Sequence, residues 1–315
     1  MQDNFSHLLK KYRDDNKLSQ NDFIDILTAN HGFSSKLDVV TLSRWENEKT
    51  TPSLEKKIRI MRKINLLVTY LYGISDFDKK TKIGKSLNYR FGMEIIKFQD
   101  LNNFRNTKKI NFKFLKNINN LHSNIKEYLT DQKRNHCNIC EQWPINIGCW
   151  SSDEKFDAFF VHLYTNDKVY NQGHCKNWSS LYKPMIEKNI NSITLLDQVT
   201  SSRIFYKLSI LCLFDTLIKN DHLEYTILHI NTDYFLKLCL FLGFDTITTI
   251  EDHPTSQNEH MDLKFACVMK IRSEKLLANK DFLFFCLKNY HDLKIHDPTL
   301  LDLIYSSDRV SEFNN

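Results

Sequence analysis

Glycine is scarce in this sequence. The 315 residues include seven glycines, whereas an average usage of ~7% would place about 22 in a chain of this length. Phosphate-binding loops use glycine so that the backbone can close on the ligand. The composition therefore disfavours any class of nucleotide- or cofactor-binding protein that depends on a glycine-built phosphate loop.

Long apolar runs are also absent. The longest, Leu208 to Ile218, is interrupted by Asp215 and is shorter than the ~20 apolar residues that a membrane-spanning helix needs. The first eleven residues carry charges and no apolar core, so no secretory signal is predicted. The sequence thus predicts a cytoplasmic protein with no membrane partner, whose eight cysteines are mostly reduced thiols.

What the chain does contain is enough apolar material for a packed interior and an uneven charge. Apolar residues make up 42% and aromatic residues 12%, and the length favours two domains. Residues 1–78 carry a net charge of +1, residues 79–134 of +10 and residues 135–315 of −6. A basic segment of this kind favours auxiliary contact with nucleic-acid phosphates, with a solubilising linker as the alternative.

The first 75 residues have the periodicity of a small helical domain. Apolar residues at i, i+3, i+4 and i+7 predict a helix from Phe5 onward. Ser19 and Asp38 are suited to cap the second and third helices. The expected helices cover residues 5–13, 20–27, 39–45, 53–64 and 66–72.

Residues 42–52, Leu-Ser-Arg-Trp-Glu-Asn-Glu-Lys-Thr-Thr-Pro, resemble the XRE (Cro/repressor-like) helix-turn-helix family, as does Gln20 at the start of the second helix. The resemblance implies an all-α head over residues 1–75 that binds double-stranded DNA, as a homodimer on two half-sites. Gln20 and Glu46 are 26 residues apart, more than is usual in the family. An insertion is therefore expected between the second and third helices.

The same resemblance implies which side chains meet DNA. Arg44 can donate two hydrogen bonds to guanine, while valine and threonine methyl groups suit thymine. Leu42 and Trp45 are expected in the core. The alternative is a protein-interaction module built on the same fold. The residues expected to face the major groove are Asp38, Val39, Val40, Thr41 and Arg44, and those expected near phosphates are Gln20, Ser43 and Lys49.

Behind the head, residues 76–135 are rich in Lys and Asn. Apolar residues recur at steps of three and four from Phe112 to Leu129 and predict a connecting helix. The apolar stripe of this helix has two alternative interpretations. It packs on the C-terminal domain, or it pairs with a second copy of the chain.

Residues 136–315 alternate between predicted strands and helices, which indicates an α/β domain. The whole chain is therefore expected to be a multi-domain protein, an all-α helix-turn-helix head followed by an α/β domain. The expected strands cover residues 156–164, 192–198, 224–230 and 263–271, and the expected helices residues 203–219 and 234–242.

Part of this α/β domain resembles the second half of a GNAT N-acetyltransferase: a helix from Arg203, a strand ending at Asn231, a second helix, Leu-Gly-Phe and a strand. The family holds the pyrophosphate of acetyl-CoA on a glycine-bearing turn, but residues 203–208 contain no glycine. Cys239 stands where the family often has its Tyr general acid. The expected domain is thus a degenerate GNAT-like one with no catalytic residues and no cofactor, with acetyl-CoA as the alternative ligand.

Cys137 and Cys140 form a Cys-x-x-Cys pair, with Cys149 and His174 further along. Thiolate and imidazole groups suit a tetrahedral zinc ion, so these four residues are the metal candidates. No second pair with zinc-finger spacing is present, and buried cysteines behave as small apolar residues. Structural thiols are therefore the preferred interpretation, with zinc or a redox-sensing pair as alternatives.

Together these features favour a sequence-specific DNA-binding transcriptional regulator whose C-terminal domain senses a small-molecule or protein ligand or mediates oligomerisation. Two alternatives stay open. One is a GNAT-type acetyltransferase with a DNA-binding head. The other is an antitoxin-like autoregulator that binds a protein partner with its C-terminal domain.

Overall fold

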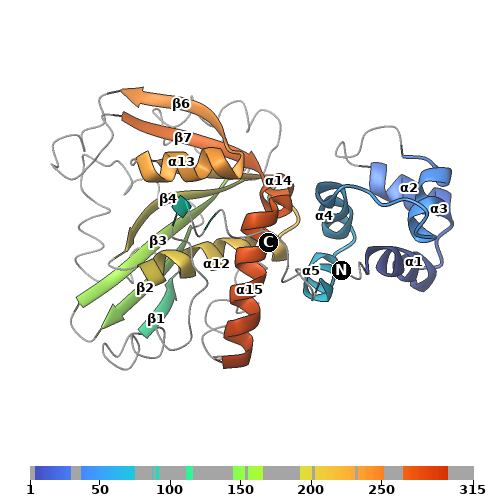
Figure 1. Cartoon of the computed structure of the whole chain (residues 1–315), viewed down its shortest axis with the longest axis horizontal. Coiled ribbons are helices and arrows are strands. Elements are labelled where there is room, and N and C mark those ends of the chain that lie inside the picture. Colours follow the sequence, from blue (N-terminus) through green and yellow to red (C-terminus); the bar gives the residue numbers. More distant parts are fainter. Residues whose placement is uncertain are drawn as a thin grey trace. The chain divides into compact units, whose positions relative to one another are not determined.

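The chain forms two compact units, residues 1–84 and residues 85–315, which we call the head unit and the sheet unit (Figure 1). The computed structural model describes residues 4–29, 37–74, 87, 90–91, 111–115, 145–152, 155–165, 192–200, 203–230, 233–251 and 265–296.

Within its described residues the head unit is entirely helical, and the five predicted helices are confirmed. A capping box begins the second helix: Ser19 Oγ accepts a hydrogen bond from the backbone N–H of Asp22, and the Asp22 carboxylate accepts from the backbone N–H of Ser19. The helices are α1 (Phe5–Asp15), α2 (Gln20–Thr28), α3 (Val39–Glu46), α4 (Leu54–Lys63) and α5 (Leu67–Gly73).

An aromatic cluster holds the head unit together. The ring of Phe5, on α1, meets Trp45 of α3 edge to face at a centroid distance of 6.4 Å and Tyr70 of α5 at 6.2 Å. Leu42 is fully buried and Trp45 is 4% exposed, as predicted. Edge-to-face pairs add to the stabilisation from apolar burial, so helices far apart in the sequence share one core.

Three head helices end in a left-handed residue that is not glycine. Lys17, Glu48 and Asn65 follow α1, α3 and α4 with φ of 52°, 57° and 56°. After each, the next residue donates its backbone N–H back to the helix, as Leu18 does to the Arg13 carbonyl at 2.9 Å. Glycine is the usual residue at such ends because a Cβ is disfavoured there. In this chain the backbone hydrogen bonds that end these helices form around residues that carry a Cβ.

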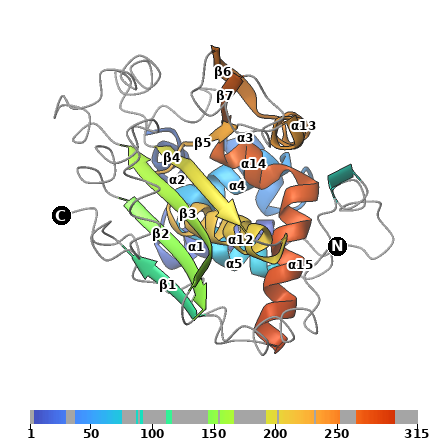
Figure 2. The same ribbon diagram turned by 90° about the vertical axis from the view of Figure 1, so that its left-hand side faces the viewer.

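The sheet unit contains a seven-stranded sheet of order β1-β2-β3-β4-β5-β7-β6. The pairings are antiparallel except that β4 and β5 run parallel. Strands β1 to β4 lie side by side in Figure 2. The strands are β1 (Asn111–Leu115), β2 (Ile145–Ser152), β3 (Lys155–Thr165), β4 (Ser192–Thr200), β5 (Tyr225–Ile230), β6 (Asp245–Glu251) and β7 (Phe265–Arg272).

Strand β1 corrects the predicted connecting helix. Residues 111–115, expected as the start of that helix, pair with β2, Phe112 opposite Trp150 and Phe114 opposite Gly148. The run Asn-Phe-Lys-Phe-Leu alternates polar and apolar residues, and this period of two suits a strand. The prediction was wrong here because the period-two run is embedded in a longer pattern of three- and four-residue steps. The rest of the expected helix lies outside the described residues.

The helices of the sheet unit with described bounds are α12 (Arg203–Lys219), α13 (Asp233–Leu242), α14 (Ser273–Ala278) and α15 (Lys280–His296). The first two agree with the predictions for residues 203–219 and 234–242, and α14 and α15 were not predicted. Helix α12 packs against α15 and β4, and Phe214 meets Phe282 at a ring distance of 6.3 Å. The apolar run of α12 is therefore core. No helix among the described ranges has the length and apolarity to cross a membrane.

The backbone strain at the left-handed residues that end the head helices can be tested by substituting glycine. We expect Lys17→Gly to raise the free energy of unfolding by about 1 kcal/mol, because glycine adopts a positive φ without a steric penalty. Urea unfolding of the full chain, followed by circular dichroism, measures the change.

Lys10→Gly is the matched control. Lys10 is an exposed residue inside α1, where glycine costs about 1 kcal/mol. The two variants should shift the unfolding midpoint in opposite directions. Destabilisation of similar size by both would contradict the strain assigned to Lys17.

Candidate nucleic-acid interface

Helix α3 begins at a charged cap. Asp38 precedes the helix, and its Oδ1 accepts a hydrogen bond from the backbone N–H of Thr41 at 2.6 Å. This contact lowers the pKa of the Asp38 carboxyl below its ordinary value, with a smaller contribution from the charge of Arg44. The cap predicted from the sequence is therefore present, and it carries a negative charge at neutral pH.

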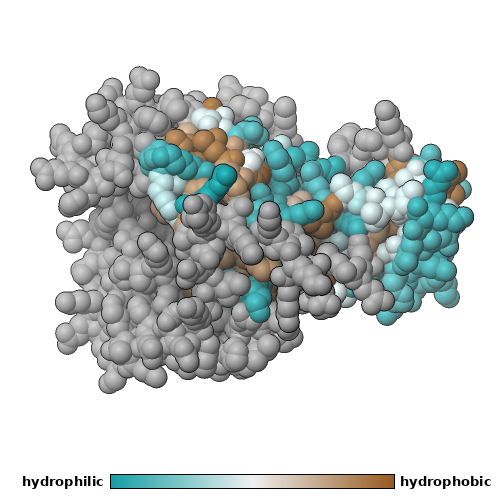
Figure 3. Space-filling view, in the orientation of Figure 1, coloured by the Kyte–Doolittle hydropathy of each residue, from teal (hydrophilic) through white to brown (hydrophobic). Residues whose placement is uncertain are grey.

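The two sides of α3 differ. Leu42, Trp45 and Glu46 are buried against the rest of the head unit, while Val40 and Arg44, one helical turn apart, are exposed. The face of the head unit visible in Figure 3 is mostly hydrophilic. Of the residues predicted to meet DNA, Asp38, Val40, Arg44 and Lys49 are exposed, and Gln20, Val39, Thr41 and Ser43 are partly exposed.

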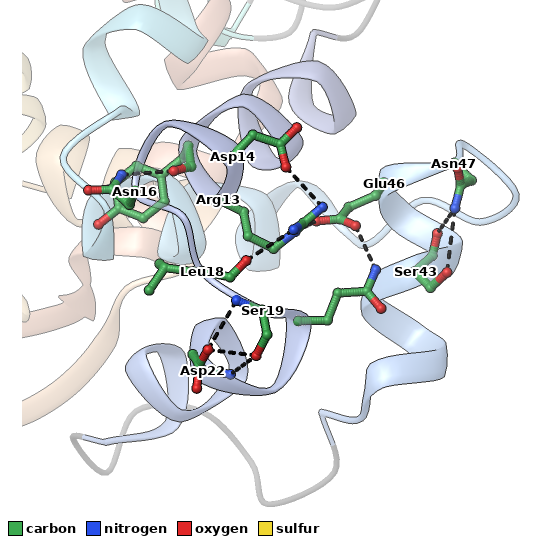
Figure 4. Close-up of polar contacts among 11 residues, drawn as sticks. Arg13, Asp14, Asn16, Leu18, Ser19, Asp22, Ser43, Glu46 and Asn47 are labelled. Carbon is green, nitrogen blue, oxygen red and sulfur yellow. Dashed lines mark hydrogen bonds and ion pairs between the residues drawn. The ribbon is translucent and has the colours of Figure 1, made fainter.

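The buried end of α3 is a carboxylate held by two neighbouring helices (Figure 4). Glu46 Oε1 accepts a hydrogen bond from Arg13 Nε of α1, and Glu46 Oε2 accepts one from Gln20 Nε2 of α2, both at 2.7 Å. The side chain of Glu46 is 3% exposed and that of Arg13 is 18% exposed. Both carboxylate oxygens are thus satisfied within the protein, as burial of a charge requires.

Arg13 is itself fixed on several sides. Its Nη1 donates to the carbonyl of Leu18 at 3.0 Å, and its Nη2 lies 3.2 Å from the carboxylate of Asp14. The hydrogen bond to Glu46 raises the pKa of Arg13, against the opposing effect of burial. A charge-assisted pair of this geometry is stronger than a neutral hydrogen bond. It ties the end of α1 to the end of α3.

Sequence reasoning missed this cluster, although it had singled out Gln20. Gln20 was expected near phosphates, and the structure places its side-chain amide on Glu46, 26 residues away. No local signal in the sequence links these two positions. The sequence offered one indirect signal. The acidic Glu46 ends the third helix next to the core residue Trp45, and the basic Arg13 lies in the last turn of the first helix.

The turn after α3 presents polar groups to solvent. Asn47 Nδ2 donates to the carbonyl of Ser43 at 2.8 Å, which caps the end of the helix. Lys49 is exposed, and its backbone N–H donates to the Arg44 carbonyl at 2.8 Å. The insertion expected between α2 and α3 falls in residues 30–36, outside the described part of the chain.

The proposed metal ligands are mostly outside the described ranges. Cys137, Cys140 and His174 lie in such segments, and Cys149 lies on β2, where it pairs with Lys113 and Phe159. The described residues contain no group of His, Cys, Asp and Glu that could hold a metal ion. The zinc hypothesis is not tested by these residues.

In the sheet unit, the parallel strands β4 and β5 separate before they end. They pair from Ser192 opposite Tyr225 to Leu195 opposite Leu228, and beyond that point β4 continues to Thr200 paired with β3. Helix α12 begins three residues later, at Arg203. In open α/β sheets, ligands bind beyond the carboxyl ends of strands, so this end of the strand pair is where a small ligand would be sought.

Cys239 stands at the position where the GNAT resemblance would place a general acid. It is 2% exposed, and burial raises the pKa of its thiol to about 12, with a smaller effect from Cys267. A buried thiol that holds its proton this firmly is unsuited to donate it to a leaving group near neutral pH. The residue is part of the core.

Comparisons with known proteins add little. No family model matches the sequence, and no curated protein matches it. Among solved structures, a yellow fever mosquito protein described as arylalkylamine N-acetyltransferase 7 is similar over 40% of this chain and 64% of its own, at 10% identity and a TM-score of 0.27. The similarity thus covers less than two thirds of the mosquito chain. We draw no conclusion from a TM-score of this size.

Removing the Glu46 carboxylate should destabilise the head unit. We expect Glu46→Ala to lower the free energy of unfolding by about 2 kcal/mol, because Arg13 and Gln20 lose a charged acceptor in a largely buried position. Urea unfolding of Arg13→Ala, Glu46→Ala and the double variant gives the coupling energy between the two side chains.

The matched control is the more exposed pair Arg59 and Glu55 on α4, whose side chains are 25% and 39% exposed. Exposed pairs at this spacing couple by about 0.3 to 0.5 kcal/mol. An Arg13–Glu46 coupling no larger than that of the α4 pair would contradict the role assigned to Glu46.

The buried thiols should be unreactive. Burial raises the pKa of Cys239, Cys267 and Cys286 above the usual range, so little thiolate is available for alkylation. Iodoacetamide treatment at pH 8 followed by peptide mass spectrometry should leave these three cysteines unmodified in the folded chain and modify them in guanidinium. Modification of Cys239 in the folded chain would contradict its placement in the core.

Proposed function

We propose that this chain is a sequence-specific DNA-binding transcriptional regulator that reads the major groove with α3. The observation that carries the proposal is the division of α3 into two sides. One side is buried and ends in the clamped carboxylate of Glu46. The other exposes Val40 and Arg44 to solvent. A rigidly held helix with an exposed reading face is what base recognition requires.

The chemistry of the exposed side favours DNA over a protein partner. The long side chain of Arg44 is exposed, so its guanidinium can reach guanine O6 and N7. Lys49 follows in the exposed turn and suits a phosphate. A regulator of this kind acts as a homodimer on two half-sites about one DNA turn apart.

The Glu46 cluster supports this role indirectly. A base contact depends on the angle at which the recognition helix enters the groove, and Glu46 connects the end of α3 to both α1 and α2. Gln20 contributes as a positioning residue through its amide. Its remaining N–H is compatible with the phosphate contact expected from the family resemblance.

For the sheet unit we propose a GNAT-like shell that binds a small molecule or a protein instead of transferring acetyl groups. The element order α12, β5, α13, β6 matches the order implied by the sequence resemblance. The diverging strands β4 and β5 favour ligand binding at their carboxyl ends. The absence of glycine from residues 203–208 and the burial of Cys239 argue against catalysis.

Selection of bound duplexes from a random DNA pool by the full-length chain tests the proposal. We expect a two-fold symmetric motif, bound with an affinity that falls steeply as salt increases, because phosphate contacts release counterions. The absence of any enriched motif would refute the proposal. Co-purification of a stoichiometric protein in that case would favour the antitoxin-like alternative.

Arg44→Ala should then reduce affinity for the selected site by about 1 to 3 kcal/mol and remove discrimination at one G·C pair in each half-site. Titration of the variant against the site and its single-base-pair substitutions measures both effects. Arg59→Ala, which removes the same side chain from α4, is the control and should leave the base preference unchanged. A uniform loss across all sequences would instead make Arg44 a phosphate contact.

A further inference from the structure

Val40 is the most exposed large apolar residue in the part of the chain that the structure describes, with 58% of its surface open to solvent. It is the second residue of α3. The residues near it on the outer side of the helix, Thr41 and Arg44, are polar. A single isopropyl group among polar neighbours is too small for a protein-docking patch, since such patches cover a few hundred Å².

We propose that Val40 is a specificity residue that contacts the C5-methyl group of a thymine. This inference rests on the proposed function, since it takes α3 to lie in the major groove. The thymine methyl is the apolar group that base pairs present in that groove. Valine suits the contact because its side chain has one strongly preferred rotamer in a helix, so little conformational freedom is lost on binding.

The charge beside Val40 favours a base edge over the sugar-phosphate backbone as its neighbour. Asp38 precedes α3, is exposed, and has a lowered pKa because it accepts the Thr41 N–H. A carboxylate at this position repels phosphates but can accept a hydrogen bond from cytosine N4. The first turn of α3 is therefore suited to the floor of the groove.

The position of the thymine follows from the helix geometry. Val40 and Arg44 are separated by one turn, a rise of about 6 Å along the axis, and base pairs stack about 3.4 Å apart. The T·A pair contacted by Val40 and the G·C pair read by Arg44 should thus lie close together in one half-site.

The experiment replaces each thymine of the selected half-site, one at a time, with deoxyuridine, which removes the methyl group and keeps the base pairing. For the unmodified chain we expect one such replacement to weaken binding about fourfold, equivalent to the ~0.8 kcal/mol that burial of one methyl-sized group contributes. Val40→Ala should bind the thymine and deoxyuridine duplexes equally. Leu240→Ala, which truncates another exposed apolar residue at 54% exposure on α13, should discriminate as the unmodified chain does.

Two results would overturn this inference and leave the proposed function standing. One is specific binding that no deoxyuridine replacement weakens. The other is discrimination that survives in Val40→Ala. Circular dichroism of Val40→Ala checks that the variant is folded. Failure to enrich any DNA site would refute the proposed function itself, and the role of Val40 with it.

Discussion

The head unit depends on the carboxylate of Glu46. This group is almost fully enclosed, and it receives Arg13 and Gln20 from two other helices at 2.7 Å each. An enclosed carboxylate without partners would be strongly unfavourable, so the three helices must keep their relative positions for the charge to be satisfied. Because Glu46 is also the last residue of α3, the same contacts fix where that helix ends. On the opposite side of α3, Val40 and Arg44 are exposed, so the proposed contacts with DNA would not disturb this core.

The scarcity of glycine has different consequences in the two units. In the head unit, Lys17, Glu48 and Asn65 take the left-handed positions that end helices, and the hydrogen bonds of each turn offset the strain. In the sheet unit, the scarcity of glycine affects the candidate phosphate loop at residues 203–208. Close approach of backbone N–H groups to a pyrophosphate requires positions without a Cβ, and residues 203–208 offer none. A scarcity of glycine that a helix end tolerates thus disfavours a glycine-built phosphate loop at residues 203–208.

The sequence predicts the local elements well and the long-range contacts poorly. Capping residues and apolar periodicity are local, so the five head helices, four strands and the helices α12 and α13 could be expected from them. Strand β1 was missed because its five residues, which alternate as a strand does, lie within a longer pattern of three- and four-residue steps, and their pairing with β2 forms only on folding. The contact of Gln20 with Glu46 joins residues 26 positions apart, and the groups that it satisfies are adjacent only after folding. The candidate base contacts could be identified from residue type. The hydrogen bonds of Glu46 with Arg13 and Gln20, which hold α3 in place, could not.

Helix α12 shows how burial on several sides limits what a helix can do. The apolar run from Leu208 to Ile218 is packed against β4 and α15, and its one charge, Asp215, is paired with Lys219 at 3.0 Å. A helix packed in this way cannot rotate or shift without disrupting a close-packed core. Its buried sides are therefore committed to the core. Its amino end at Arg203 follows the end of β4 at Thr200 by three residues, so the position of the helix start is coupled to the strand that leaves β5.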